Sequence, residues 1–391
     1  MIVRQFISWV RTAPACERAE ATRSLARAWL ISSLSEDDRA AAEGALLMLL
    51  DDPSPLVRQA MADVFAGSAH APATIVRALS LDQSSVALPI LEHSPLLIDA
   101  DLVDLVATGN SETQCAIARR VNLPASVCAA IAEVGSPAAA LELIENPHAV
   151  LAPFSWDRIV ERHGHLAAIR ESMLGLDDLP PATRLALIAK LSDTLAHFVV
   201  ARRWLSSDRA ERIVVEARER SAINLATRSR GAETGQLVSH LRATGQLTAG
   251  LILRALLSGN LELFDRALIE LSGLPSQRVA ALLYDRGGAS LDALLTRAGL
   301  PSSTFPAFRA ALDATNEIGF VGTVDGAARL RRRMVERVLT RCEADPDVSE
   351  PLLILLRRFA TESAREEARV FCDQLVADVI DIAPEHQRIA A

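Results

Sequence analysis

The sequence has few aromatic residues and almost no lysine. Aromatic residues make up 4% of the 391 positions, tyrosine occurs once, and Lys190 is the only lysine. Half of all residues are hydrophobic, so a large core would consist mainly of Ala, Leu, Val and Ile. Such a core suits closely packed helices better than sandwiches or barrels, whose strands favour aromatic and β-branched residues. The composition therefore predicts an all-α fold.

Sequence signals for catalysis, metal binding and membrane insertion are also missing. No Gly-rich phosphate loop occurs, no window reaches 18 uncharged apolar residues, and the first ten residues lack a convincing secretory signal. The formal charge of −8 is opposite to that of most nucleic-acid binders. We expect a cytoplasmic protein that is not an enzyme, has no cofactor, metal or membrane contact, and keeps its cysteines reduced and mostly buried. These are Cys16, Cys115, Cys128, Cys342 and Cys372.

Residues 52–148 repeat one pattern four times. A polar turn leads into an apolar helix, a Pro or Gly break follows, and a second apolar helix completes the copy. Successive turns lie around Asp52, Asp82, Asn110 and Ser136, at offsets of 30, 28 and 26 residues. One pair of short helices cannot bury its own apolar face, so neighbouring pairs stack to share a core. The repeat predicts an α-solenoid of short HEAT-like helix pairs.

Changes in this rhythm predict four segments. Residues 1–50 form an N-terminal helical cap, and residues 51–176 form the HEAT-like α-solenoid. The break at 177–181 opens a second helical domain over 177–320, where Gly and Pro separate short helices. Residues 321–391 contain the C-terminal helices and a loose tail.

Several short segments carry a resemblance to a known family. They are Leu251-Ile252-Leu253-Arg254-Ala255-Leu256, Gly259-Asn260-Leu261 with Phe264, Leu283-Tyr284-Asp285-Arg286-Gly287-Gly288, Ala298-Gly299-Leu300-Pro301 and Phe305-Pro306-Ala307-Phe308-Arg309. In these segments the chain resembles a bacterial family catalogued as domain of unknown function 2336, most specifically over about residues 245–340. The resemblance implies a helical fold. It implies no activity and supplies no catalytic residues.

The first candidate binding surface is a ridge of arginines near the C-terminus. Residues four apart lie on one side of a helix, and neighbouring like charges there are unfavourable. An acidic group should therefore face the ridge. It belongs either to the chain itself, at Glu336, Glu362, Glu366 or Glu367, or to a partner protein or phosphate-bearing ligand. The ridge consists of Arg329, Arg333, Arg337 and Arg341, widened by Arg331 and Arg332.

The second candidate surface follows the inner helices of the repeats. Their polar residues either line a concave binding groove or are simply solvated. Two further pairs, Asp52 with Arg58 and Asn110 with Arg119, are expected to align neighbouring copies. The groove candidates are Gln59, Asp63, Gln114, Arg120 and Glu142.

Three other groups have a functional and a plain interpretation. His163 and His165 lie two residues apart and favour a polar surface turn over a metal site, because no Cys/His cluster is near. The stretch 284–288 favours a helix end with a Gly-Gly turn over a binding loop. Trp204 beside Arg202 and Arg203 is either an interface anchor or a partly buried tryptophan at a helix end.

Three functions are compatible with these features. The first is a protein–protein interaction scaffold or regulatory adaptor with an unidentified protein partner. The second is nucleic-acid binding, which requires the arginine ridge to share one surface with Arg202, Arg203, Arg228 and Arg230. The third is an enzyme whose site lies between the two halves of the chain. The repeat, the acidic charge and the lack of catalytic motifs favour the scaffold.

Overall fold

The computed structural model describes residues 8–10, 12–283, 289–318, 324–346 and 348–382. These ranges contain helices and the turns that join them, and no β-strand. The all-α prediction is confirmed. The chain divides into two compact units, residues 1–179 and 180–391, which are described separately below. The finer division into four segments stays a prediction.

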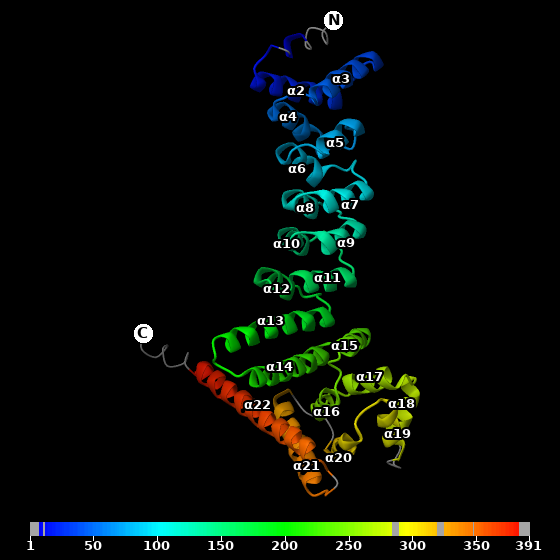
Figure 1. Ribbon diagram of the computed structural model, residues 1–391, viewed down its shortest axis with the longest axis vertical. Coiled ribbons are helices and arrows are strands. Elements are labelled where there is room, and N and C mark those ends of the chain that lie inside the picture. The colour runs from blue at the N-terminus through cyan, green and yellow to red at the C-terminus, as the bar shows by residue number, and fades with distance from the viewer. Residues whose placement is uncertain (1–7, 11, 284–288, 319–323, 347, 383–391) are drawn as a thin grey trace, which may run out of the picture. The chain divides into compact units, whose positions relative to one another are not determined.

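The first unit is a stack of short helices in two layers. Helices α2, α4, α6, α8, α10 and α12 pack in succession in one layer, while α7, α9 and α11 pack in succession in the other (Figure 1). The helices are α2 (Ala15–Ile31), α3 (Glu36–Leu49), α4 (Pro55–Phe65), α5 (Ala73–Ser80), α6 (Ser84–His93), α7 (Asp99–Thr108), α8 (Ser111–Ala118), α9 (Ala125–Val134), α10 (Pro137–Glu145), α11 (Pro153–His163) and α12 (Ala167–Leu174).

Local sequence explains where these helices begin. Asn110 accepts a hydrogen bond from the Thr113 amide at 2.9 Å, and Ser136 caps α10 in the same way. Pro55 occupies the first turn of α4, where its missing N–H costs nothing. Val57, Met61 and Phe65 of α4 are then fully buried along one stripe, whereas Leu56 faces solvent. Burying each large apolar side chain contributes about 1.5–3 kcal/mol, so the stripe fixes which face of the helix turns inward.

The second unit has longer helices at its two ends. Helices α13 and α14 form one antiparallel hairpin, α21 and α22 form another, and short helices lie between them in sequence (Figure 1). The elements are α13 (Pro181–Ala201), α14 (Ser207–Arg228), α15 (Ala232–Ala243), α16 (Ala249–Leu257), α17 (Leu261–Ser272), α18 (Ser276–Leu283), α19 (Ala289–Arg297), η1 (Ser302–Thr304), α20 (Phe305–Ile318), α21 (Val324–Glu343) and α22 (Glu350–Ile382).

Two apolar clusters hold the second unit together. The larger cluster joins α16 to α22 and contains Phe264 and Phe308, whose rings stack at 6.2 Å between centroids. The smaller cluster joins the start of α13 to the end of α14 and to α15, α16 and α17, around Leu185, Ile223 and Leu237. Both clusters lie away from the turn between α13 and α14. That end of the hairpin therefore stands outside the core of its unit.

Candidate functional site

The arginine ridge on α21 is mostly neutralised within the chain. Arg332 contacts Glu336 at 2.7 Å and Glu367 at 2.9 Å, while Arg329 lies 3.6 Å from Glu367. Further pairs join Arg331 to Glu366, Arg337 to Glu317, and Arg341 to Glu317 and Asp313. Only Arg333 of the ridge is exposed without an ion pair among the described residues. The intramolecular interpretation therefore accounts for all of the ridge except Arg333.

Two of the five groove candidates are buried, so their assignment to an open surface was wrong. Gln114 donates to the Val106 carbonyl and accepts from the Ser136 amide, at 2.9 and 2.8 Å. Arg120 donates to the carbonyls of Leu91 and Ser94, in the preceding copy of the repeat. Both side chains satisfy backbone groups that the ends of short helices leave open. Burial disfavours the charged form of Arg120 and lowers its pKa. The two hydrogen bonds to carbonyls partly offset the cost of burying this charge.

The other groove candidates remain at the surface. Glu142 pairs with Arg119 at 2.6 Å, and Asp63 lies 3.7 Å from Arg23. Gln59 is half-buried. These contacts do not bring the candidates into one site.

Polar contacts between successive copies follow a different pairing from the predicted one. Arg58 contacts the Asp82 carboxylate at 2.5 and 3.0 Å, and it reaches only the carbonyl of Asp52. The carboxylate of Asp52 accepts instead from Arg18, at 2.8 Å. The hydrogen bond from Arg58, opposed by burial, holds the pKa of Asp82 below its usual value.

The predicted contact between Asn110 and Arg119 does not form. Asn110 caps its own helix, and Arg119 pairs with Glu142. Each of these side chains has a nearer partner than the one that spacing alone suggested. The polar contacts between copies nevertheless fix how one pair stacks on the next.

The remaining candidates also have structural explanations or lie outside the description. His163 is buried against the Gly135 carbonyl at 3.2 Å, so its assignment to a surface turn was wrong, whereas His165 is exposed. Across the described ranges, no group of three His, Cys, Asp or Glu side chains could hold a metal ion. Residues 284–288 lie outside the described residues. The cysteines are free, and three of the five are buried, which agrees with the expectation that most would be, whereas Cys16 and Cys372 are exposed.

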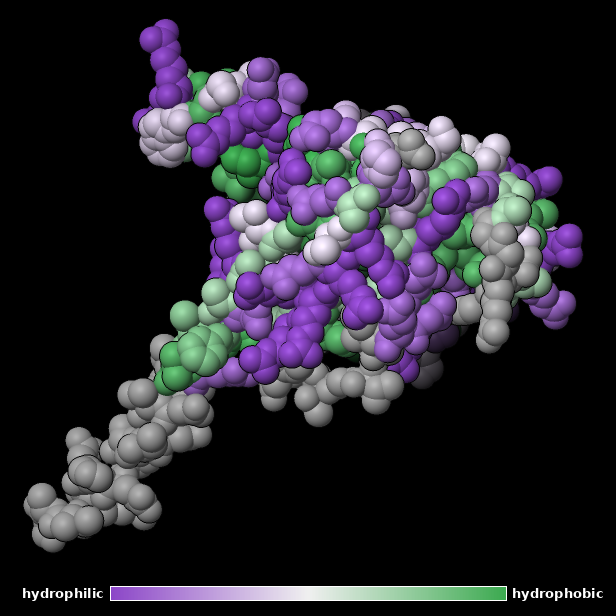
Figure 2. All heavy atoms as spheres, turned by 90° about the horizontal axis from the view of Figure 1, so that it is seen from below, coloured by the Kyte–Doolittle hydropathy of each residue, from purple (hydrophilic) through white to green (hydrophobic). Residues whose placement is uncertain are grey.

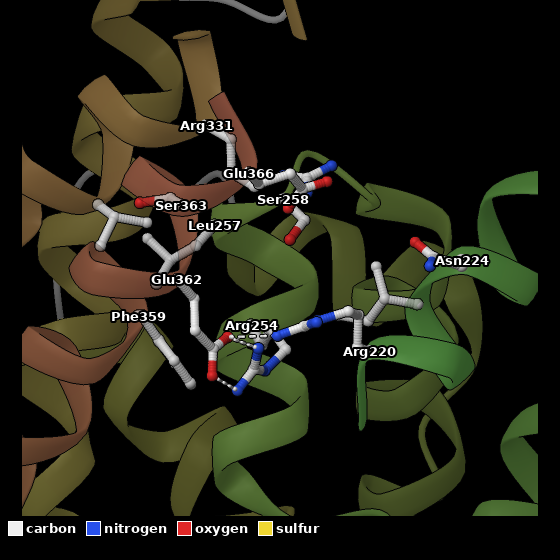
Figure 3. A pocket seen from close by; sticks show the side chains of 12 residues that line it. Arg220, Asn224, Arg254, Leu257, Ser258, Arg331, Phe359, Glu362, Ser363 and Glu366 are labelled. Carbon is white, nitrogen blue, oxygen red and sulfur yellow. Dashed lines mark hydrogen bonds and ion pairs between the residues drawn. The ribbon is translucent and has the colours of Figure 1, made fainter. Parts of the chain in front are cut away.

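A buried charge cluster in the second unit was not expected from the sequence. Arg254 of α16 forms an ion pair with Glu362 of α22 and stacks on the Phe359 ring at 4.2 Å (Figure 3). It also lies 3.2 Å from Glu219 of α14. Burial raises the pKa of Glu219 despite its proximity to Arg254. The sequence analysis had placed Glu362 opposite the arginine ridge. Its partner instead lies 108 residues away in sequence.

The cavity beside this cluster is small. Its volume is about 40 Å³, and its lining includes Arg220, Ser258, Arg331 and Glu366 (Figure 3). One water needs roughly 10–15 Å³ by this measure, so the cavity has room for a few waters and for no sizeable ligand. The cluster thus ties α16 to α22 through charge-assisted hydrogen bonds between Arg254 and Glu362, and an ion pair between Arg254 and Glu219 links α16 to α14.

The hairpin of α13 and α14 carries apolar side chains into solvent at its turn. From Ile188 to Ala201 no residue of α13 is buried, and on the first half of α14 only Ala210 is. Trp204 is 66% exposed, Leu195 55% and Phe198 46%. We call residues 188–215 the hairpin end. Because these side chains stay exposed in the folded unit, they form an uncovered apolar surface.

The turn has a defined geometry. After α13, the Trp204 amide donates to the Val199 carbonyl at 3.0 Å and the Arg203 amide donates to the Val200 carbonyl at 2.8 Å. These two hydrogen bonds define a Schellman motif. Its left-handed position is occupied by Arg203, with φ +58°. A residue with a side chain costs roughly 1–2 kcal/mol in that conformation, so the turn is ordered at a cost in stability.

The side chains of the turn form a compact group. The rings of Phe198 and Trp204 meet edge to face, with 5.7 Å between centroids and an interplanar angle of 87°. The guanidinium of Arg202 lies over the Phe198 ring at 5.1 Å. The prediction of a partly buried Trp204 was wrong, and the interface-anchor interpretation fits its exposure. The sequence analysis did not identify Leu195 and Phe198. Their only signal is an i, i+3 spacing of apolar residues, which is also typical of buried helix faces.

The nucleic-acid hypothesis requires the arginine ridge and two further arginine pairs to share one surface. Arg202 and Arg203 precede α14, whereas Arg228 and Arg230 lie at its opposite end. A helix of 22 residues is about 33 Å long. The two arginine pairs are therefore far apart, and the ridge on α21 is largely paired with carboxylates. These contacts do not gather the arginines at one site, and nucleic-acid binding stays a hypothesis.

Apolar side chains are also exposed near the end of α22. Phe371 and Leu375 are both at least half exposed. In the view of Figure 2, green apolar side chains lie among purple hydrophilic ones on this face of the molecule. No described residue forms an aromatic contact with Phe371, which distinguishes this part of α22 from the ordered group at the hairpin end.

Comparison with known sequences assigns the chain to a family. The family described as an uncharacterised protein conserved in bacteria, DUF2336, matches residues 86–345. The chain belongs to this family. Its match begins within the helical stack, well before the segments at 245–340 that carry the resemblance most clearly. Comparisons with curated proteins and with solved structures gave no match. None of the described helices is both long and apolar enough to cross a membrane.

Proposed function

We propose that this DUF2336 protein is a non-catalytic protein–protein interaction scaffold. The observation that carries the proposal is the hairpin end, where Trp204 and Phe198 are ordered against each other yet left exposed. Tryptophan and arginine are enriched among the residues that dominate binding energy at protein interfaces. Ordering these side chains in advance lowers the entropic cost of binding. The hairpin end thus has the composition and order of a contact surface.

The stacked helices of the first unit support the same proposal. Short HEAT-like pairs form extended surfaces that bind other proteins, and their neighbours share one core. The polar contacts of Arg58 and Arg120 between copies make such a stack a defined platform. We also infer a cytoplasmic location, because the cysteines are free and reduced thiols persist in that compartment.

Affinity capture with matched variants tests the proposal. The full chain is used as bait in lysate from cells that make the protein naturally, beside a variant with Phe198→Ala and Trp204→Ala. The control carries Leu81→Ala and Phe154→Ala, which remove two other exposed apolar side chains, both from the first unit. We expect a defined protein that wild type and control retain and the hairpin variant loses. A partner retained equally by all three baits would contradict the assignment of the contact surface.

A further inference from the structure

We propose that the hairpin end binds an acidic amphipathic helix of a partner protein. This inference rests on the proposed function and specifies the partner's chemistry. The bound helix would lie against α13 and α14 as a third helix, with its apolar face on the hairpin end and its carboxylates next to the arginines. Three features of the hairpin end support this, namely its shape, its charge and the conformation of Arg203.

The shape favours a helix as the bound element. Leu195 and Phe198 lie three residues apart and therefore share one side of α13, and Arg202 continues that row one turn later. Trp204 packs against Phe198 at the end of the row. An amphipathic helix presents apolar residues at i, i+3, i+4 and i+7 and can cover such a row along its length. The exposure of Leu195, Phe198 and Trp204 shows that no other helix of this unit covers the row.

The charge favours an acidic partner. Between residues 202 and 212 the hairpin end has four arginines and only two carboxylates, Asp208 and Glu211. None of these arginines forms an ion pair or a side-chain hydrogen bond to a carboxylate in the described residues. The arginines of α21, by contrast, are nearly all paired. In a chain of net charge −8, an unpaired basic group of this kind selects carboxylates through electrostatic complementarity. The four are Arg202, Arg203, Arg209 and Arg212.

The left-handed conformation of Arg203 distinguishes this turn from similar turns in the same unit. Helices α15, α16 and α19 end in the same pair of backbone hydrogen bonds, and each has glycine in the left-handed position. These glycines are Gly245, Gly259 and Gly299. Only at the end of α13 does the turn hold an arginine there. A residue with a long side chain in an unfavourable conformation points to a use for that side chain.

Fluorescence anisotropy with synthetic helical peptides tests the proposal on the full chain. The probe is a labelled peptide of about 20 residues, roughly 30 Å as a helix, with Leu along one face and Glu on both flanks. Three comparators are a peptide with Lys in place of Glu, a scrambled acidic peptide without an apolar face, and anionic phosphatidylglycerol vesicles. Sedimentation of the chain alone shows whether a second copy occupies the surface.

We expect the acid-flanked peptide to bind at least about tenfold more tightly than either comparator peptide, and to weaken at high salt. Phe198→Ala with Trp204→Ala should reduce its affinity by about tenfold or more. Arg209→Glu with Arg212→Glu should reverse the preference towards the Lys-flanked peptide. Arg333→Glu is the matched control, because Arg333 is also exposed and unpaired, and it should change nothing.

Several results would overturn the inference. These are equal binding of the acidic and basic peptides, a preference for vesicles that the hairpin variants abolish, and self-association that depends on Trp204. If any of these occurs while affinity capture still loses its partner in the Phe198 and Trp204 variant, the proposed function stands and only the helix assignment fails. If the capture also shows no dependence on the hairpin end, both fail.

Discussion

Phe198 and Trp204 meet edge to face across the turn that ends α13, with 5.7 Å between their ring centroids. They occupy the two positions whose apolar contact often accompanies a Schellman motif. In most such turns this contact helps to close the helix end. Here both rings also face solvent, so one pair of side chains orders the turn and forms the exposed surface. This dual role underlies the first two predictions.

Replacing Arg203 with glycine should stabilise the fold and at the same time weaken partner binding. Glycine adopts the left-handed conformation without strain, although it loses more entropy on folding. We expect Arg203→Gly to raise the free energy of unfolding by about 0.5–1 kcal/mol and to weaken partner binding. Urea unfolding and the peptide assay measure the two effects. Loss of stability in this variant would contradict the account of the turn.

The two tryptophans at positions 29 and 204 should behave differently on truncation. Trp29 is buried and packs against Phe65 at 6.1 Å, so Trp29→Ala should cost about 3–5 kcal/mol. Trp204→Ala removes an exposed side chain and should cost less than about 1 kcal/mol, while abolishing capture of the partner. Thermal unfolding of both variants, compared with the wild type, measures this difference. Comparable destabilisation would mean that Trp204 is a structural residue.

Adjacent arginines 119 and 120 provide a second matched pair. Arg120→Met leaves the carbonyls of Leu91 and Ser94 unpaired in a buried position and should cost on the order of 3 kcal/mol. Arg119→Met removes a largely exposed ion pair with Glu142 and should cost less than about 1 kcal/mol. Urea unfolding followed by circular dichroism gives both values. Equal costs would show that the contact of Arg120 with the preceding copy does not stabilise the stack.

The pair formed by Arg58 and Asp82 should stabilise the stack in a pH-dependent way. The pKa of Asp82 is lower in the folded chain than its ordinary value of 3.8. The stabilisation is therefore complete above that value and is lost as the pH falls towards the folded pKa. Asp82→Asn should cost about 1 kcal/mol at neutral pH, and the difference from wild type should shrink below pH 3.8. Asp104→Asn, at an exposed position, is the control and should show no such change.

Glu219 should produce the opposite pH dependence. Burial raises its folded pKa above the ordinary 4.5, so its contribution is complete below that value and decreases as the pH rises through the folded pKa. Glu219→Gln should flatten the decline in stability between pH 4.5 and neutrality. Urea unfolding across this range, with the exposed-site variant Glu211→Gln as control, measures the slope. An unchanged slope would show that Glu219 titrates in the folded chain as it does when unfolded.

The sequence predicts the short helices well because their ends are set locally. Pro55, Asn110 and Ser136 begin helices through missing donors or side-chain caps, and these effects act within four residues. Long-range polar contacts are different. Nothing near Arg254 in sequence shows that Glu362 faces it, and Arg120 resembles any other arginine until the preceding copy is in place. Such pairings depend on how helices pack.

The sequence predicted only part of the hairpin end, for a related reason. The sequence identified Trp204 and its neighbouring arginines as a candidate group. Whether such residues are exposed depends on whether another helix packs over them, which the local sequence does not show. The turn also lacks the glycine that usually marks a left-handed helix end, since Arg203 takes its place. The regular spacing of the arginine ridge made it the first candidate surface in the sequence. In the structure most of its arginines are paired with glutamates from α20, α21 and α22.

Site-specific photo-crosslinking in cells that make the protein naturally is the most direct measurement. A photoreactive phenylalanine analogue is placed at position 204 and, in a separate control, at the exposed position of Phe154. We predict a crosslink from position 204 to one defined protein, through a segment that forms an acidic amphipathic helix, and none to that protein from position 154. Absence of a protein adduct at position 204, or the same adducts from both positions, would contradict the assignment of the hairpin end as the contact surface.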